Sequence, residues 1–177
     1  MSEGVGELID RLTRVVPDWP EPGVVFRDLS PVLAHPDGLA AVVDATVGAV
    51  QALGSVDVVA GIESRGFWLA AAVATRLGVG FVPVRKAGKL PGDVLSADYS
   101  LEYGTATLEV GAEAVEPGSR VVLMDDVLAT GGTLAAGAEL VESAGGVPVG
   151  ASVLIEIGAL GGRERLAPLV VDSLRTY

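Results

Sequence analysis

Residues 121–133 read VVLMDDVLATGGT and join an apolar run to two adjacent carboxylates, Asp125 and Asp126. The small-residue turn that follows consists of Ala129, Thr130, Gly131, Gly132 and Thr133. A turn that opens a helix presents unpaired N–H groups at the positive end of the helix dipole, and such a turn can hold a phosphate. The carboxylates cannot hold a phosphate, but they accept hydrogen bonds from hydroxyl groups or bind a cation. The two halves together predict a ligand with a terminal phosphate and a nearby diol, such as a ribose 5-phosphate.

The same residues also fit a simpler interpretation, in which a solvated acidic pair precedes an ordinary strand–turn–helix connection. The fixed spacing of acids, turn and helix start favours the ligand site. A Walker A loop is excluded, because Gly131 and Gly132 are not followed by Lys and Ser or Thr at the required spacing.

A second group of residues is basic. Arg85, Lys86 and Lys89 place three of the chain's 12 Lys and Arg residues within five positions, and Arg65 follows another predicted strand. A solvated surface cluster is the ordinary interpretation of such a run. Because the cations follow strand ends and accompany a phosphate motif, the sequence favours a pyrophosphate site.

Apolar periodicity predicts the elements that must position these groups. We expect helices over residues 4–15, 36–51, 67–77 and 133–144, and strands over residues 56–60, 79–84, 105–110, 120–124 and 147–155. Alternating strands and helices imply an α/β fold with a mainly parallel central sheet and helices on both faces. Ligands bind such sheets at the carboxyl ends of strands, where the two aspartates are expected to lie. Residues 86–103 lack apolar periodicity and predict a long mobile loop that pairs with the strand after it.

The composition limits the remaining possibilities. A length of 177 residues predicts a single domain over residues 1–177. A formal charge of −11 argues against sequence-independent nucleic-acid binding, which needs a basic surface. The absence of cysteine rules out disulfides and thiol catalysis and fits a reducing cytoplasm. No signal peptide is visible in the first residues, and polar residues interrupt the most apolar stretch, so no membrane span is expected.

The chain resembles the type I phosphoribosyltransferases in four segments. Residues 121–133 are similar to the motif with which this family binds phosphoribosyl pyrophosphate (PRPP). Residues 20–28, PEPGVVFRD, resemble its base-binding segment, and residues 61–67, GIESRGF, resemble its pyrophosphate loop. Residues 88–92, GKLPG, with residues 99–104, YSLEYG, resemble its catalytic flap. The resemblance implies the fold of this family, with a small hood from the N-terminal segment, a flap over about residues 86–104 and a cis peptide bond between Glu63 and Ser64.

The resemblance also implies an activity. Family members transfer ribose 5-phosphate from PRPP to a nitrogen base, and the chain is most similar to members that use adenine in purine salvage and form AMP and pyrophosphate. Hypoxanthine, guanine or xanthine as the base is the nearest alternative, and a PRPP-sensing regulator without catalysis is another. Mg²⁺ would enter with PRPP and be held through PRPP rather than by a direct protein site. A cytoplasmic homodimer is implied.

Some site residues rest on the resemblance. Glu102 would carry the proton of the purine, although its position alone indicates a solvated loop carboxylate. Tyr103 would lie near the PRPP site. The base-binding residues would be Val25, Phe26, Arg27 and Ile157. From the residues alone, Phe26 and Arg27 fit a core ring with a surface cation equally well.

Overall fold

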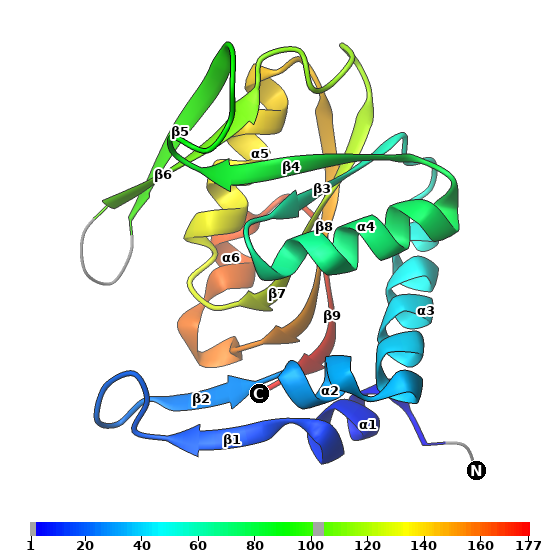
Figure 1. The fold of residues 1–177 in the computed structure, drawn as a ribbon, viewed down its shortest axis with the longest axis vertical. Helices are drawn as coiled ribbons and strands as arrows, with labels where there is room; N and C mark the ends of the chain where they lie inside the picture. Colours follow the sequence, from blue (N-terminus) through cyan, green and yellow to red (C-terminus); the bar gives the residue numbers. More distant parts are fainter. Residues whose placement is uncertain (1–2, 101–104) are drawn as a thin grey trace. The chain divides into compact units, whose positions relative to one another are not determined.

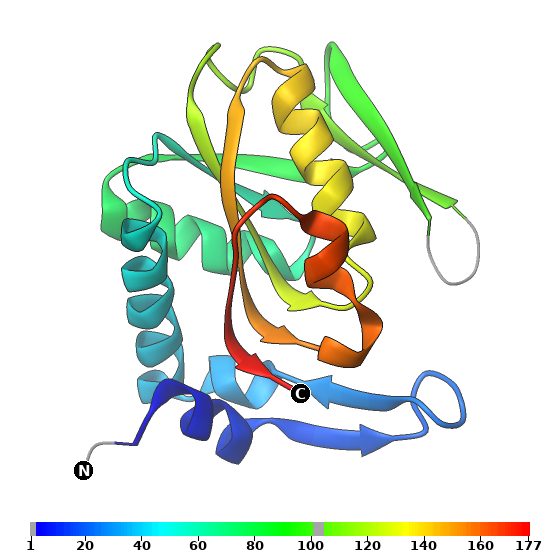
Figure 2. The same cartoon turned by 180° about the vertical axis from the view of Figure 1, so that it is seen from behind.

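The computed structural model describes residues 3–100 and 105–177, and it separates into two compact units at Ala45 and Thr46. Figures 1 and 2 show the elements of the two units from opposite sides. Each unit is described by itself below. The single domain of residues 1–177 stays a prediction.

The first unit contains a two-stranded antiparallel sheet and short helices (Figure 1). Its elements are α1 (Val5–Leu12), β1 (Arg14–Pro17), β2 (Val25–Asp28), α2 (Ser30–Ala34) and the start of α3 (Pro36–Ala52). The helix predicted over residues 4–15 is too long, because Thr13 is extended and Arg14 pairs with Asp28 of β2. Strand pairing therefore overrides the helical spacing of the last residues.

The second unit holds a seven-stranded sheet in the order β5-β6-β4-β3-β7-β8-β9. Its elements are β3 (Val58–Ile62), α4 (Arg65–Leu77), β4 (Gly80–Lys86), β5 (Val94–Ser100), β6 (Thr105–Gly111), β7 (Arg120–Leu128), α5 (Gly132–Ser143), β8 (Val147–Glu156), the 3-10 helix η1 (Gly158–Leu160), α6 (Gly162–Leu166) and β9 (Val171–Thr176). The four strand pairs from β4 to β9 are parallel, and β6 pairs antiparallel with β4 and β5. This arrangement confirms the predicted α/β class with a mainly parallel sheet.

Helices cover both faces of this sheet. Figures 1 and 2 show α4 on one face and α5 with α6 on the other. The core between them contains the fully buried side chains of Ile62, Leu123 and Leu134. Gly66 lets the start of α4 approach β7, because a Cβ at this position would collide with the carbonyl oxygen of Met124. The approach brings the residues that precede α4 beside the acidic part of β7.

Two predicted boundaries are wrong in ways that affect the site. The strand predicted over residues 120–124 continues to Leu128, because β7 stays paired with β8 as far as Glu156 after its pairing with β3 ends at Met124. The two aspartates therefore lie within a strand at the point where one neighbour stops. The loop predicted over residues 86–103 contains β5, which forms the expected hairpin with β6.

Three elements near the C-terminus, η1, α6 and β9, were not anticipated from the sequence. Among the described residues, the structure contains no helix with the length and apolar character needed to cross a membrane.

Candidate active site

The phosphate-binding turn predicted from the sequence lies between β7 and α5. Gly131 has a φ of 77°, in the left-handed region that favours glycine, and Gly132 begins the helix. Residues 127–134 surround a cavity of about 70 Å³. The first N–H groups of a helix have no carbonyl acceptor within that helix, so those of α5 are available to an anion. The turn therefore has the shape and the donors for a phosphate group.

A second glycine supports this turn from the other side. A Cβ on Gly131 would lie 2.7 Å from the carbonyl oxygen of Gly162, and a Cβ on Gly162 would collide with the carbonyl oxygen of Ala129. Backbone therefore packs directly on backbone at this point. The next residue, Arg163, fixes α6 to the sheet by donating from Nε to Glu156 Oε1 at 3.1 Å and from Nη2 to Ser173 Oγ at 3.2 Å.

Asp125 and Asp126 are adjacent on β7 but have different surroundings. Asp126 is 4% exposed, and its Oδ2 lies 2.9 Å from Nε of Arg65 in an ion pair. Asp125 keeps a partial opening to solvent, and its Oδ1 accepts the backbone N–H of Asp126 at 2.8 Å. A buried and a partly buried carboxylate that lack a full set of donors suit hydroxyl groups that donate to them.

Burial sets the protonation of this pair. It raises the pKa of Asp125 well above its ordinary value, and the negative charge of Asp126 raises it further. Burial also raises the pKa of Asp126, but the guanidinium of Arg65 opposes that increase. A ligand that donates hydrogen bonds to these carboxylates would stabilise their charged form.

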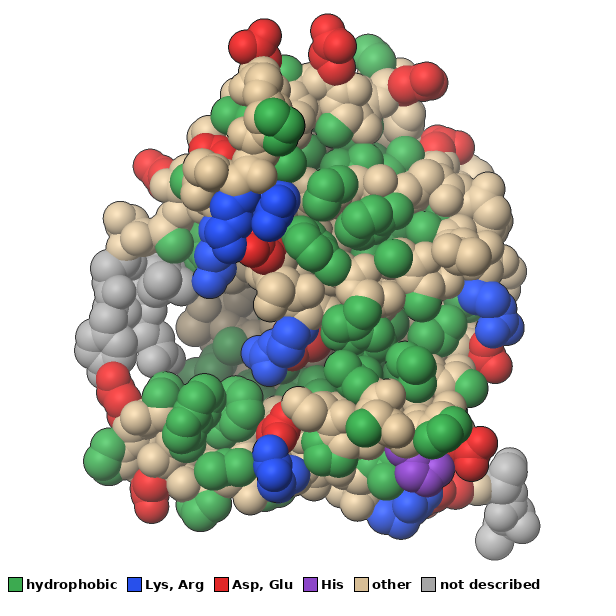
Figure 3. All heavy atoms as spheres, viewed as in Figure 1, with side chains coloured by type: hydrophobic (Ala, Val, Ile, Leu, Met, Phe, Trp, Pro, Cys, Tyr) green, Lys and Arg blue, Asp and Glu red, His purple; other side chains and the backbone are tan. Residues whose placement is uncertain are grey.

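The predicted cations gather at the end of β4 around one carboxylate. Glu63 forms an ion pair with Lys89, and its Oε2 accepts the backbone N–H of Lys86 at 2.9 Å and lies 3.5 Å from Nε of Arg85. In Figure 3, Lys and Arg side chains surround an acidic side chain on this face. The segment from Glu63 to Arg65, which leads from β3 into α4, therefore contacts the cations at and just after the end of β4 through Glu63 and contacts Asp126 of β7 through Arg65. The Glu63–Ser64 peptide bond is cis, as predicted.

The predicted base-binding residues lie in both units. Val25, Phe26 and Arg27 lie on β2 of the first unit, where the ring of Phe26 packs against Trp19 with a centroid distance of 4.3 Å. Ile157 follows β8 in the second unit and donates its N–H to the carbonyl oxygen of Leu128 at 2.8 Å. Their role in base binding stays a prediction. Glu102 and Tyr103 lie outside the described residues.

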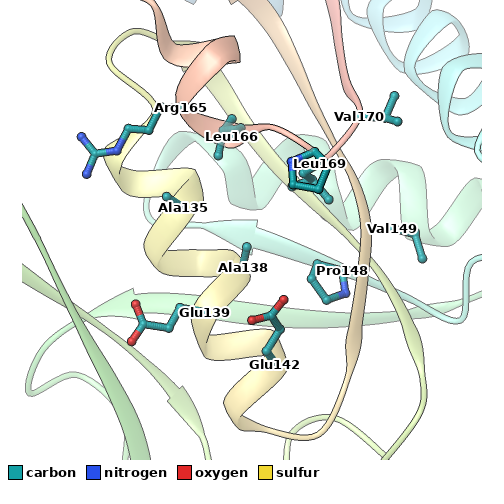
Figure 4. Close-up of a pocket in the computed structure, with 11 residues that line it drawn as sticks. Ala135, Ala138, Glu139, Glu142, Pro148, Val149, Arg165, Leu166, Leu169 and Val170 are labelled. Carbon is teal, nitrogen blue, oxygen red and sulfur yellow. The ribbon is translucent and has the colours of Figure 1, made fainter.

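A larger cavity of about 400 Å³ lies against α5, β8 and the chain around α6 (Figure 4). Its charged residues are Glu139, Glu142 and Arg165, and its remaining lining is apolar or backbone. Two carboxylates beside one guanidinium do not suit a phosphate. The smaller cavity at the turn after β7 is therefore the candidate phosphate site, because it has the donors that an anion needs.

The two aspartates can contribute to a magnesium site but cannot complete one. No group of three or more His, Cys, Asp or Glu residues that could hold a metal ion occurs in the part of the chain that the structure describes. Mg²⁺ demands octahedral oxygen ligands, and proteins often supply only one or two carboxylates beside substrate phosphates and water. The residues present fit that second mode of binding.

Three residues at the site were not found from the sequence as contributors. Glu63 was noted only as part of a motif, although its place directly after a strand is the same signal that identified Arg65. Gly162 and Arg163 act on the turn through the backbone and through Glu156. The only signal for them was the Gly161–Gly162 pair, which is too common to be informative alone.

Comparisons with known proteins agree with this geometry. The model of the phosphoribosyl transferase domain family matches residues 28–175. The adenine phosphoribosyltransferase of Thermobifida fusca is 57% identical over 177 residues, which cover 99% of each chain. The crystal structure of adenine phosphoribosyltransferase from Thermoanaerobacter pseudethanolicus has a TM-score of 0.93 and 45% identity, with 97% of this chain and 99% of that chain covered. The enzyme from Saccharomyces cerevisiae, complexed with D-2,5-dideoxy-2,5-imino-altritol 1,6-bisphosphate and adenine, has a TM-score of 0.91 and 36% identity, with 96% and 98% covered.

Proposed function

The chain belongs to the phosphoribosyl transferase family, and we propose that it transfers ribose 5-phosphate from PRPP to adenine, giving AMP and pyrophosphate in purine salvage. The observation that carries this proposal is the arrangement around residues 63–65. This segment contacts Lys89 and Arg85 near the end of β4 through Glu63 and contacts Asp126 of β7 through Arg65, and β7 leads directly into the phosphate-binding turn. Adenine as the base is supported by the high identity to adenine phosphoribosyltransferases and by the adenine bound to the yeast relative.

The donor would bind along β7. Backbone N–H groups of residues 129–133 and the hydroxyls of Thr130 and Thr133 bind the 5-phosphate, while Asp125 and Asp126 accept hydrogen bonds from the ribose hydroxyls. Arg65, already beside Asp126, favours the ionised form of that carboxylate and is assigned to the pyrophosphate end. Tyr103 packs near PRPP. These contacts fix C1′ of the ribose relative to the incoming base.

The reaction breaks the bond between C1′ and the pyrophosphate oxygen and forms a bond between C1′ and a ring nitrogen of adenine. Positive charge develops on the ribose, and negative charge develops on the leaving pyrophosphate. Arg85, Lys86 and Lys89 stabilise that negative charge, which lowers the barrier. The ring nitrogen loses its proton, and the carboxylate of Glu102 is the group that accepts that proton. Val25, Phe26, Arg27 and Ile157 hold the base.

Mg²⁺ is the proposed cofactor and would bind with PRPP. PRPP oxygens and water would hold the ion, and Asp125 and Asp126 would bind the ribose hydroxyls rather than the metal directly. When bound, the ion neutralises charge on the pyrophosphoryl group. Removal of Mg²⁺ with a chelator should abolish turnover, and full activity in excess chelator would contradict this assignment.

The decisive experiment is product analysis with adenine, PRPP and Mg²⁺. We expect AMP and pyrophosphate in equal amounts. A panel with hypoxanthine, guanine and xanthine then tests the base, and faster turnover with one of these purines would replace adenine in the proposal. PRPP binding without product from any purine would instead indicate a regulator.

Glu102→Gln tests the proton-handling role. The neutral amide cannot take up the proton, so kcat should fall by about 10²-fold or more while the Kd for PRPP changes little. Stopped assays for AMP and calorimetry with PRPP measure the two quantities. A near-normal kcat would remove Glu102 from the mechanism.

A homodimer and a cytoplasmic location complete the proposal. The homodimer rests on the family resemblance, and Phe81 of β4, which is 37% exposed with its ring against Phe67 of α4, is one exposed aromatic side chain that a second copy would cover. Light scattering of the purified chain tests the dimer, and a monomer at micromolar concentration would contradict it. Fractionation of the source cells tests the location.

A further inference from the structure

The pyrophosphate cations of the second unit have an internal anionic partner, Glu63. The residue follows β3, and its backbone N–H donates to the carbonyl oxygen of Val84 at 2.9 Å, which fixes it beside β4. Its side chain is 10% exposed. One carboxylate oxygen pairs with Nζ of Lys89, and the other accepts the N–H of Lys86 and lies 3.5 Å from Nε of Arg85. A single carboxylate therefore contacts the side-chain cations of Arg85 and Lys89 and the backbone N–H of Lys86.

The contacts that Glu63 makes are those that a pyrophosphate oxygen would make. Ammonium, guanidinium and backbone N–H groups are the usual donors to phosphate and to carboxylate alike. The hydrogen bond from Lys89, aided by the N–H of Lys86 and by the charge of Arg85, lowers the pKa of Glu63. The carboxylate is therefore ionised at neutral pH, and it offers these donors the same charge type as the ligand.

The loop that carries the cations is held in place by a second carboxylate as well. Glu109 on β6 accepts the N–H of Gly88 at 2.9 Å, and the N–H of Ala87 donates to the carbonyl oxygen of Thr107 at 3.1 Å. The loop thus has backbone support that does not depend on Glu63. The ion pairs of Glu63 with the Lys89 and Arg85 side chains can break while the backbone stays in place.

We propose that Glu63 is an internal counter-anion of the pyrophosphate site, which occupies Lys89 and Arg85 before the ligand binds and weakens the affinity for pyrophosphate. The inference rests on the proposed function, because the proposed function assigns these cations to pyrophosphate. Entry of the pyrophosphoryl group exchanges the carboxylate for phosphate oxygens at Lys89. The carboxylate then remains close to the bound anion and repels it, which favours release of the product.

The test is Glu63→Gln, studied in the full chain by calorimetry with pyrophosphate and Mg²⁺. Glutamine keeps the shape and can still accept the N–H of Lys86, but it lacks the charge. Loss of one charged competitor should lower the Kd for pyrophosphate by about tenfold, on the scale of a charge-assisted contact. Damage to the loop would instead weaken binding, so tighter binding distinguishes a counter-anion from a merely structural residue.

Glu109→Gln is the matched control. It also removes a carboxylate that accepts a loop N–H at 2.9 Å, but no ion pair with the cluster is made by Glu109 among the described residues. Glu109 lies opposite Arg85 in the β4–β6 pairing but forms no ion pair with it in the described part of the chain, so the Kd of this variant for pyrophosphate should fall much less than that of Glu63→Gln. Equal tightening in both variants would overturn the specific role of Glu63.

A second variant, Glu63→Asp, keeps the proposal testable if Glu63→Gln folds poorly, and a double variant tests the pairing with Lys89. Glu63→Asp retains the charge but withdraws it from Lys89, so it should bind pyrophosphate more tightly than the original chain. In a Lys89→Met background, Glu63→Gln should tighten binding less, because the pair is already absent. Unchanged or weaker pyrophosphate binding in folded Glu63 variants would refute the proposal. The measurement needs no adenine, so failure of the proposed transferase activity would be seen separately, as absence of AMP from the original chain.

Discussion

At the scale of single residues, the candidate site depends on charges that are held away from water. Asp125 and Asp126 both lie on β7, but their neighbours affect the ionisation of the two carboxylates differently. Arg65 compensates Asp126, whereas burial and the neighbouring charge both act against ionised Asp125. Without a ligand, ionisation of Asp125 costs free energy. A ligand hydroxyl group that donates to this carboxylate would stabilise its ionised form. Ionisable residues whose pKa is strongly perturbed are frequent at functional sites.

Asp125→Asn should raise the folding stability of the chain at pH 8 and at the same time weaken PRPP binding. The pKa of Asp125 is raised in the folded chain, so its contribution favours folding at pH values below about 3.9 and is lost as the pH rises through the raised native pKa. The variant should therefore be more stable than the original chain in urea unfolding at pH 8, and this difference should shrink toward pH 5. Its Kd for PRPP should rise by about tenfold or more, because a charged acceptor is lost. A variant that is less stable at pH 8, or that binds PRPP normally, would contradict this account.

At the scale of elements, the phosphate turn is positioned from both sides. β7 and α5 form it, while Gly162 at the start of α6 packs against Ala129 and Gly131. Arg163 then connects α6 to Glu156 at the end of β8. The turn is therefore held by a part of the chain that follows it by about thirty residues. A local sequence pattern could not predict this contact.

Gly162→Ala should loosen the turn. The added methyl group would collide with the carbonyl oxygen of Ala129, so the turn must shift, and the KM for PRPP should rise by about tenfold. Gly48→Ala in α3 is the control, because no atom lies within 4 Å of its Cβ and alanine favours helix. Steady-state kinetics with varied PRPP measure both variants. Equal KM values for the two alanine variants would show that α6 does not position the turn.

The elements also show how far the sequence alone could be interpreted. The parallel core strands, the long helices and the phosphate turn were predicted because each has its own periodicity or spacing. β5 was missed, although Leu95, Ala97 and Tyr99 alternate on one side, because glycine and proline dominate the residues before it. The extension of β7 to Leu128 depends on pairing with β8, which is not local information. The ion pairs of Arg65 and Glu63 also required the fold, because only the fold brings their partners to the same turn.

At the scale of the whole molecule, an acidic chain holds anionic ligands. The net charge is −11, yet three of the 12 basic residues lie within residues 85–89. Long-range charge therefore opposes the approach of PRPP, and short-range donors must supply its affinity. At physiological ionic strength the long-range part is largely screened, so the local arrangement decides binding.

The division of the chain into two units predicts which part of the molecule PRPP stabilises. Every residue that we assign to PRPP lies in the second unit, residues 46–177, whose core surrounds β3 and β7. At 100 times its Kd, a ligand adds about 2.7 kcal/mol to the unit that binds it, which corresponds to a rise in Tm of about 5–10 °C for a chain of this size. Scanning calorimetry with PRPP and Mg²⁺ should show this rise, and Asp125→Asn, with a Kd about tenfold higher, should lose about half of it at the same PRPP concentration. If the two units unfold in separate transitions, only the transition of the second unit should move. A shift confined to the transition of the first unit would mean that PRPP binds mainly outside the site on β7.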